Sequence, residues 1–451
     1  MIRSLLLFSM AHVCLLSFSQ QAIVAGPMPG YIELRTAKIW LQFANNITEA
    51  TIQYKPVEKK SSKLSSQKIA LSGGEFNTVV FTLTALDPGT SYQYYITAGL
   101  SKKFLDSGTF TTQEIWQLRK PPGDFTFLAG SCVYFNQPEY DRPGKPYGGD
   151  SSIFETMARE KSSFMLWLGD NWYTRYPDFS SEWGLHYRPS HERRIPVLQP
   201  FLKSMSHYAI WDDHDYGPND ADKSYILKET SRDVFKKYWP NPTYGMNGQG
   251  IYSMFSYNDA EFFLLDDRWN RSSDRMQDSI NGTVNKEKKM FGDEQMEWLK
   301  NALLYSKSNT FTKFRVIVTG SQVLNRYSRF DALRFYPGEF YELLSFLEEN
   351  KINGVVFITG DRHHSEIIKM ERKTGYPLYD VTVSPLTSSP AKTQGDEINN
   401  PNRVGNEIDE QNYGRFSITG EGKERKLTVE LMGIKGDVLY TWSVKAADLS
   451  F

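Results

Sequence analysis

Short apolar runs, broken by turn residues, fill the first quarter of the chain. Residues 21–116 contain five such runs, AKIWLQFA, ATIQYKPV, TVVFTLTA, SYQYYITAG and DSGTFTTQ. Runs of this length that are rich in β-branched and aromatic residues are typical of strands. The pattern therefore predicts an all-β region in this part of the chain.

One turn in this region carries a further signature. In LDPGTSYQYYI, Pro88 and Gly89 form the turn, and Tyr92 or Tyr94 can hydrogen-bond back across it, as in a tyrosine corner. On this segment, residues 21–116 resemble a small fibronectin III-like β-sandwich. The following stretch, QLRKPPGD, contains two prolines and a glycine and is typical of a linker.

Strands alternate with helices in the remaining chain, residues 122–451. Ser152 with Glu155 predicts a capping box for one amphipathic helix, and Asp293 predicts the N-cap of another. We expect an α/β domain with mixed central sheets in layers, in which the C-terminal strands close an edge of a sheet. Six near-continuous apolar runs match strands buried on both faces: FTFLA, SFMLWL, HYAIW, AEFFLL, FRVIVT and GVVFIT.

Residues 1–20 predict a secretory signal peptide. Arg3 supplies a positive start, residues 5–18 supply an apolar stretch, and SFSQ offers a cleavage site. The apolar stretch is too short and too interrupted for a stable membrane span, and no later run approaches 18 uninterrupted apolar residues. We therefore expect an exported protein without a transmembrane span.

Charge and cysteine content narrow the function further. The chain has 52 Lys and Arg against 53 Asp and Glu, so it lacks the positive surplus of a nucleic-acid-binding protein. Of its two cysteines, Cys14 lies in the predicted signal peptide, which leaves Cys132 unpaired. An unpaired thiol is unusual in an exported protein and needs a reason. The sequence indicates no oligomeric state.

Polar side chains gather where five predicted strands end, which is where open α/β sheets bind ligands. Several acids in one crevice repel one another unless cations neutralise them, so the pattern predicts more than one bound metal ion. The clusters are GSC (130–132), GDNWY (169–173), DDHD (212–215) with Asn219 and Asp220, GSQ (320–322) and GDRHH (360–364).

The donor types narrow the choice of metal. A thiolate and a histidine suit a transition metal, whereas Asp and Asn oxygens also suit Ca²⁺ or Mg²⁺. The chain has neither C-x-x-C nor H-E-x-x-H, so the zinc motifs find no support.

Each cluster also has a purely structural interpretation. Gly-Asp after a strand is commonly a turn, and an isolated cysteine such as Cys132 is commonly a small buried hydrophobe. His364, Asp212 and Asp215 can be supporting or surface groups. Four ionisable residues directly after one strand cannot all be solvated cheaply, however, and four such strand ends in one domain favour a metal site.

The motifs GSC, LGDNWY, WDDHDYGPND and GDRHHSE, in this order, resemble those of the PhoD-like alkaline phosphatases of the metallophosphoesterase superfamily. FFLLDDRWNR, with Asp266 and Arg268, GDEQMEWL and DVTVSPLTSSP also match. The resemblance covers nearly the whole chain after residue 20. It implies a metallophosphatase-like domain with a centre of two or more metal ions, iron plus calcium, that hydrolyses small phosphate esters.

The resemblance also implies roles for individual residues. Cys132 would be the thiolate ligand of the iron and Asp170 a bridging carboxylate, while Asn219, Asp361 and His363 would complete the second metal position. The family places a tyrosine ligand upstream of WDDH. There this chain reads HYRPSHERRIPVLQPF, in which His191 or Tyr187 could take the role, and His191 is favoured.

The implied mechanism is attack by a metal-activated water. His214 or His363 would protonate the leaving oxygen, and Asp213 would orient an imidazole or a water. Arg362 or Arg193 would contact the phosphoryl oxygens, because a guanidinium fork matches them.

Two alternatives remain open from the sequence. The first is a phosphodiesterase or phospholipase D-like enzyme that uses the same centre, with specificity set by the loops around residues 136–150 and 388–400. The second is a noncatalytic calcium-binding adhesion module, which accounts for the sandwich and the acidic loops but not for a thiol and histidines at strand ends.

Overall fold

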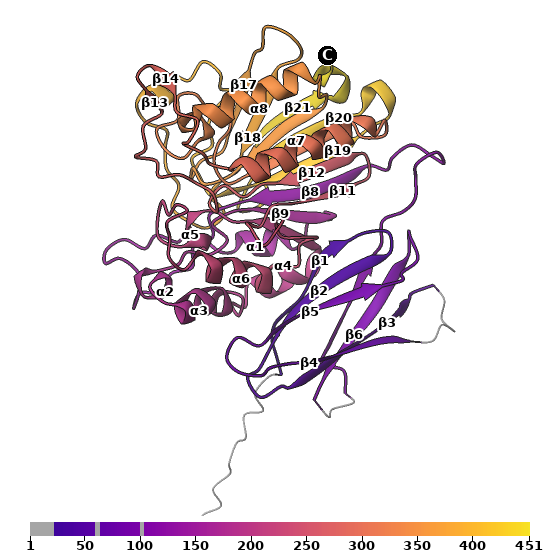
Figure 1. Ribbon diagram of the computed structural model, residues 1–451. Helices are drawn as coiled ribbons and strands as arrows, with labels where there is room; N and C mark the ends of the chain where they lie inside the picture. Colours follow the sequence, from indigo (N-terminus) through magenta and orange to yellow (C-terminus); the bar gives the residue numbers. More distant parts are fainter. Residues whose placement is uncertain (1–21, 59–63, 100–102) are drawn as a thin grey trace, which may run out of the picture.

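Two antiparallel sheets form the N-terminal region of the computed structural model, which describes residues 22–58, 64–99 and 103–451 (Figure 1). The predicted signal peptide lies outside these residues. The hydroxyl of Tyr92 accepts a 2.8 Å hydrogen bond from the Asp87 N–H, which confirms the tyrosine corner and selects Tyr92. One sheet has the order β1 (Ile23–Ile32), β2 (Thr36–Phe43), β5 (Thr78–Thr84), and the other β4 (Ser65–Ala70), β3 (Glu49–Pro56), β6 (Ser91–Ala98), β7 (Asp106–Thr111).

Two six-stranded mixed sheets form the centre of the α/β region. The first has the order β10 (Ser206–Ile210), β9 (Phe164–Leu168), β8 (Phe125–Gly130), β19 (Asn412–Thr419), β20 (Lys426–Gly433), β21 (Val438–Lys445). The second has the order β11 (Ser253–Tyr257), β12 (Ala260–Leu264), β15 (Phe314–Thr319), β16 (Val355–Thr359), β18 (Leu378–Thr382), β17 (Glu366–Met370). Strands β8 to β10 are parallel to one another, as are β12, β15, β16 and β18, so within each set the carboxyl ends share an edge.

Aromatic side chains hold the two sheets face to face. The rings of Phe127 and Phe262 meet edge-on with centroids 5.3 Å apart, and Phe164 meets Phe255 edge-on at 5.4 Å. This arrangement buries both inner faces and explains the continuous apolar runs of the central strands.

Helices lie on both sides of the paired sheets (Figure 1). On one side are α7 (Asp293–Ser308) and α8 (Pro337–Glu349), and on the other α1 (Ile153–Met157), α4 (Leu198–Ser204) and α6 (Lys228–Tyr238). The short α2 (Tyr176–Phe179), α3 (Glu182–Glu192), α5 (Asp213–Tyr216) and the hairpin β13 (Ser279–Ile280), β14 (Thr283–Val284) complete the region.

Neither predicted side-chain cap forms. Ser152 already has helical dihedrals and its side chain makes no cap hydrogen bond. Asp293 is the first residue of α7 rather than its cap, and the Glu339 carboxylate of α8 accepts the N–H of Gly292 at 2.7 Å.

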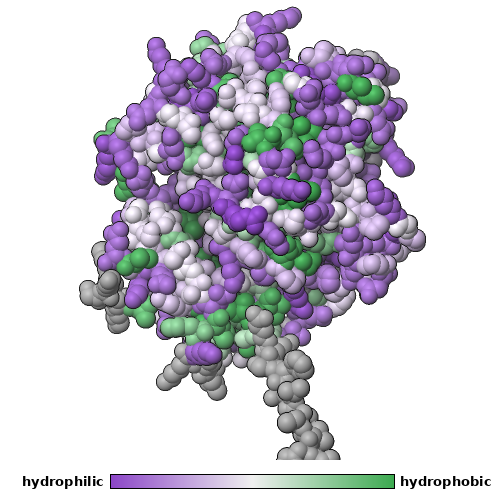
Figure 2. Space-filling view, turned by 180° about the vertical axis from the view of Figure 1, so that it is seen from behind, coloured by the Kyte–Doolittle hydropathy of each residue, from purple (hydrophilic) through white to green (hydrophobic). Residues whose placement is uncertain are grey.

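A helix must be both long and apolar to cross a bilayer. Within the described ranges, every helix is too short or too polar to cross a bilayer. The face seen in Figure 2 is mostly polar, with apolar residues in small separate groups.

The sandwich packs tightly against the α/β region. The Tyr31 N–H donates to the Pro240 carbonyl at 3.0 Å, and the Trp40 indole N–H donates to the Lys237 carbonyl at 2.8 Å. A Cβ at Gly30 would lie 2.2 Å from the Pro240 ring, so only glycine fits there. Trp40 is fully buried in the core of the α/β region.

We expect Arg425→Ala to be strongly destabilising. Its guanidinium makes two hydrogen bonds to buried Asp259, at 2.6 and 2.9 Å, and thereby joins the β20 end of one sheet to the β11–β12 turn of the other. Removing it leaves Asp259 buried without its cation, a loss of about 3–5 kcal/mol in the free energy of unfolding.

Denaturant unfolding measures this loss. The matched control is Lys445→Ala, whose exposed ion pair with Glu424 is screened by solvent and should contribute little to stability. Equal effects of the two substitutions would contradict the assignment.

Candidate metal centre

The polar clusters that follow the parallel strands come together at one edge of the two sheets. The Cys132 N–H points to the Gly169 carbonyl at 3.4 Å, and the Gly360 N–H donates to the Gly320 carbonyl at 2.8 Å. A Cβ on Gly360 would lie 2.6 Å from the Leu168 carbonyl, so glycine is required for this approach. Strand ends of both sheets therefore contribute to one site.

Four residues at this edge have left-handed backbone conformations although none is glycine. The φ angles are +64° at Cys132, +52° at Asp170, +67° at Asp361 and +59° at His363. Such conformations cost on the order of 1–3 kcal/mol each and concentrate at functional sites. Backbone strain thus coincides with four of the predicted ligands.

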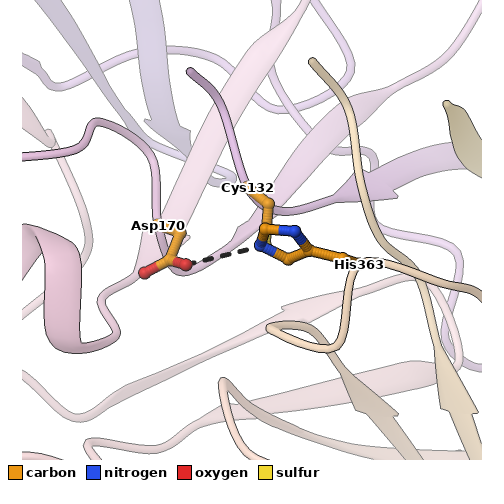
Figure 3. A group of neighbouring side chains, drawn as sticks. All are labelled: Cys132, Asp170 and His363. Carbon is orange, nitrogen blue, oxygen red and sulfur yellow. Dashed lines mark hydrogen bonds between the residues drawn. The ribbon is translucent and has the colours of Figure 1, made fainter. Parts of the chain in front are cut away.

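The Cys132 thiol lies at the centre of the first group of donors. Its Sγ is 3.6 Å from Asp170 Oδ2, and donor atoms of Cys132, Asp170 and His363 all lie within 4.8 Å of one another (Figure 3). The Ser384 hydroxyl also donates to Sγ at 3.2 Å. Three of the predicted ligands are therefore close enough to share one ion.

Tyr173 joins this group, although sequence reasoning did not select it as a ligand. Its hydroxyl lies 3.0 Å from His363 Nε2 and also hydrogen-bonds the Cys132 thiol. Burial, with the nearby Asp170 and Cys132, raises the pKa of Tyr173 well above its usual value. The available signal was its position three residues after Asp170, in the same strand-end cluster.

The tautomer of His363 is fixed by its second nitrogen. Nδ1 lies 2.8 Å from the Ser389 carbonyl, which can only accept, so Nδ1 carries the proton. The lone pair is then on Nε2, which faces Tyr173. This is the arrangement of a histidine that ligates a metal while its other N–H is held by a carbonyl.

Asp213 and His214 connect the first group to a second group of acids. Donor atoms of Asp170, Asp213 and His214 lie within 4.8 Å of one another, as do those of Asp212, Asp213 and Asp361. The His214 N–H points to Asp170 Oδ1 at 3.3 Å and to Asp213 Oδ1 at 2.9 Å. Asp213 is thus shared by the group that contains Asp170 and the group that contains Asp361.

The acids carry more negative charge than the neighbouring cations balance. Burial, with Asp213 and Cys132 as neighbours, raises the pKa of Asp170 well above its usual value. Burial and the Asp331 and Asp213 charges raise the pKa of Asp361 to about 7, and burial raises the pKa of the Cys132 thiol to about 12.

One acid in the cluster keeps a low pKa. Burial alone would raise the pKa of Asp213, but the charges of His214 and Arg268 and the Asp220 N–H outweigh it and hold the pKa well below its usual value. Arg268 itself is paired with Asp212 and Asp331. Its single charge does not balance the other carboxyl groups.

This donor set fits metal binding. Asp212 Oδ2, Asp267 Oδ1 and Asn171 Oδ1 are buried and have no hydrogen-bond partner among the described residues. Of these residues, Asp212 belongs to a close group with Asp213 and Asp361. Carboxylate oxygens together with a thiol, a phenol and an imidazole match the ligands of a transition metal and a harder cation.

An open cleft of about 580 Å³, here called the acidic cleft, is lined by Asp170, Asp213, His214, Asp361 and His363. Asn219 lines it at the surface and makes no direct bond to the acids. Arg362 also lines it, but its guanidinium is held by Glu397 at 2.9 and 3.1 Å and by Gln322 and Ser328 at 2.6 Å each. The Arg362 guanidinium is therefore fixed by protein acceptors at the edge of the cleft.

His191 lies apart from these donors. It is half-buried in α3, where its Nδ1 is 3.4 Å from the Tyr187 hydroxyl and its ring stacks on Tyr187 at 5.4 Å. Arg193 is buried 4.1 Å over the Trp239 ring. Among the described residues, the close groups of His, Cys, Asp and Glu donors do not include His191, and the Tyr187 hydroxyl accepts a hydrogen bond from Gln137 at 3.0 Å.

Comparison with known proteins gives one family. The family model described as PhoD-like phosphatase matches residues 127–429. Alkaline phosphatase D of Bacillus subtilis (strain 168) is 24% identical over 285 residues, which cover 53% of this chain and 46% of that protein. The chain therefore spans about half the length of this relative.

Solved structures give the same fold. A structure of PhoD matches with a TM-score of 0.73 at 18% identity, over 95% of this chain and 90% of that one. Purple acid phosphatase PPD1 from yellow lupin (Lupinus luteus) seeds matches with a TM-score of 0.66 at 11% identity, over 93% of this chain and 74% of that one. The prediction of a metallophosphatase-like α/β domain with mixed sheets after an all-β region is confirmed.

We expect Asp170→Asn to stabilise the metal-free protein while abolishing the gain from metal. The raised pKa of Asp170 means that the metal-free fold is increasingly penalised as the pH rises above the ordinary pKa of an aspartate. The neutral amide avoids this penalty, so the thermal midpoint of chelator-treated protein rises, most clearly near pH 8.

The matched control is Asp233→Asn, which changes an exposed carboxylate in α6 whose side chain is 62% exposed. Its midpoint should equal that of the parent chain with and without metal. A chelator-treated Asp170→Asn variant that unfolds earlier than its parent would contradict the charge argument.

Proposed function

Because the chain belongs to the PhoD-like phosphatase family, we propose that it is a metal-dependent phosphoesterase that hydrolyses small phosphate esters with water as the nucleophile. The observation that carries the proposal is an open cleft lined by Asp170, Asp213, His214, Asp361 and His363, with the buried Cys132 thiol directly behind Asp170 and His363. Structural metal sites are usually closed, whereas this one faces solvent, as a substrate requires.

We assign the ligands to two positions, iron and calcium. Cys132, Tyr173 and His363 would hold the iron, and Asp170 would bridge to the second position. The oxygens of Asp361 and Asp213, with Asn219 at the cleft surface, suit calcium. When bound, the ions polarise the phosphoryl oxygens and lower the pKa of a water molecule.

His214 is better placed than His363 to donate a proton to the leaving oxygen. His363 uses its N–H on the Ser389 carbonyl, so its free nitrogen carries no proton. The His214 ring lines the acidic cleft and stacks on Tyr173 at 4.1 Å. Asp213 accepts the His214 N–H and so fixes the backbone that positions this ring.

Arg362 supports the site without contacting the phosphoryl group. Glu397 neutralises its guanidinium, and its Nη1 is shared between Gln322 and Ser328. Its role in the proposal is to hold the backbone between Asp361 and His363.

Export rests on the sequence of residues 1–20, which lie outside the described structure. The charged start, apolar stretch and small-residue cleavage site support it. We propose an exported enzyme on that ground.

We expect Asp170→Asn and Cys132→Ser each to lower kcat by at least about 100-fold, because each removes a metal ligand. p-Nitrophenyl phosphate and bis-p-nitrophenyl phosphate measure monoester and diester hydrolysis, and metal analysis of the same samples reports occupancy. A preference for the diester would select the phosphodiesterase alternative.

Near wild-type rates with full metal content in both variants would overturn the assignment of the centre. Calcium alone, with no turnover of either ester, would favour the adhesion module instead. Asp233→Asn again controls for the loss of a carboxylate elsewhere.

We expect Tyr173→Phe to remove or shift the visible absorption of the iron-loaded protein, since phenolate and thiolate ligands of ferric iron absorb visible light by charge transfer. Tyr187→Phe and His191→Ala are the controls, because these side chains contact one another in α3. Loss of the band in Tyr187→Phe, with Tyr173→Phe unchanged, would reverse the choice of tyrosine.

A further inference from the structure

A second cavity, here called the aromatic cavity, adjoins the acidic cleft. It encloses about 540 Å³, within the range of about 300–1,000 Å³ of small-molecule sites. Tyr147, His214 and Asn219 line both spaces. A molecule with its phosphoryl group among the candidate metal ligands would therefore extend directly into the aromatic cavity.

Rings supply the apolar wall of this cavity. Six of its lining residues are Tyr134, Tyr140, Tyr147, Tyr173, Tyr176 and Phe179, and three more are prolines. Leu, Ile, Val and Met are absent from the described residues that line it. Flat faces favour stacking on another ring, whereas an acyl chain is better surrounded by branched aliphatic groups.

The inner end of the wall is held rigidly. The buried Arg175 guanidinium lies 4.0 Å over the Tyr134 ring, and it donates to Asp141 at 3.0 Å and to the Phe135 carbonyl at 2.7 Å. The Tyr134 hydroxyl donates to Asp141 at 2.7 Å. Because these contacts fix the inner wall before a ligand binds, binding of a ring costs little conformational entropy there.

The outer end of the wall is open and positively charged. Tyr140 and Tyr176 are 48% and 79% exposed. Arg142 and Lys145 stand between the tyrosines of the 134–147 loop, are exposed, and form no hydrogen bond or ion pair with other residues in the described ranges. Free cations at the entrance favour the approach of an anionic substrate.

We propose that the aromatic cavity binds the alcohol part of the substrate and selects phosphate esters whose alcohol carries a flat ring, such as a nucleoside. This inference rests on the proposed phosphoesterase function of the acidic cleft. His214, at the boundary of the two spaces, would then lie beside the ester oxygen that joins phosphate to alcohol.

Two esters that differ only in the ring test the inference on the metal-loaded protein. Adenosine 5′-monophosphate and ribose 5-phosphate lose the same primary alcohol of the sugar, so their chemistry is matched. We expect kcat/KM to be roughly tenfold higher for the nucleotide, the effect of one base–aromatic stack. Tyr140→Ala and Tyr176→Ala should each reduce this ratio.

Tyr305→Ala is the matched control. Tyr305 is 74% exposed, like Tyr176, but lies in α7 and lines neither space. The ratio of kcat/KM for the nucleotide to kcat/KM for ribose 5-phosphate should be the same in Tyr305→Ala as in the parent chain.

The outcomes separate this inference from the proposed function. Equal kcat/KM for the two esters would overturn ring selection and leave the phosphoesterase intact. If octyl phosphate is hydrolysed faster than ethyl phosphate and Tyr176→Ala removes the difference, the cavity selects an alkyl chain rather than a ring, which overturns the inference. If neither sugar ester is hydrolysed, the p-nitrophenyl esters report separately on the proposed function, and calorimetry with adenosine decides on the cavity: binding that Tyr176→Ala weakens supports the cavity, and no binding overturns it.

Discussion

Buried negative charge that the chain does not itself balance is the constraint that the rest of the structure accommodates. The side chains of Asp170 and Asp213 are almost completely withdrawn from solvent, yet the buried cation Arg268 is already shared by Asp212 and Asp331. The glycines before the acids allow the loops to approach closely enough for this crowding, since a Cβ at position 169 would lie 2.6 Å from the Asp212 side chain. Strained backbone and unsatisfied oxygens follow from the same crowding, and bound cations relieve it.

Much of this arrangement could be predicted from the sequence, because strands buried on both faces leave continuous apolar runs and their ends leave compact polar clusters. Features that depend on tertiary contacts could not. Tyr173 reaches the thiol because the chain turns with positive φ at Asp170, and the side of α3 on which His191 lies is decided by packing. Glu397, which neutralises Arg362, comes from a polar loop 35 residues later in the chain, and the Gly292 N–H before α7 is bound by the distant carboxylate of Glu339.

The candidate metal ligands lie at strand ends, whereas the aromatic cavity is formed mainly by loops and a short helix. Strand ends hold the candidate ligands, where neighbouring strands fix each backbone and small displacements are resisted. The aromatic cavity is built mainly from the segments 134–147 and 173–179, whose sequences can change without disturbing a sheet. Reaction and selectivity therefore depend on different parts of the chain, with Tyr173 and His214 common to both.

The seating of the sandwich on the α/β region has a consequence for how the chain can be divided. Sequence composition places a boundary near residues 117–124, but Trp40 completes the core on the far side of that boundary and Gln42 donates to Ser190 in α3 at 2.6 Å. Cutting at the linker would expose the apolar surface around Tyr238, on which Trp40 packs, and remove a support of α3. Through the Arg188–Asp178 hydrogen bond, α3 in turn holds α2, which lines the aromatic cavity. The smallest autonomous unit of this protein is thus larger than its metallophosphatase-like domain.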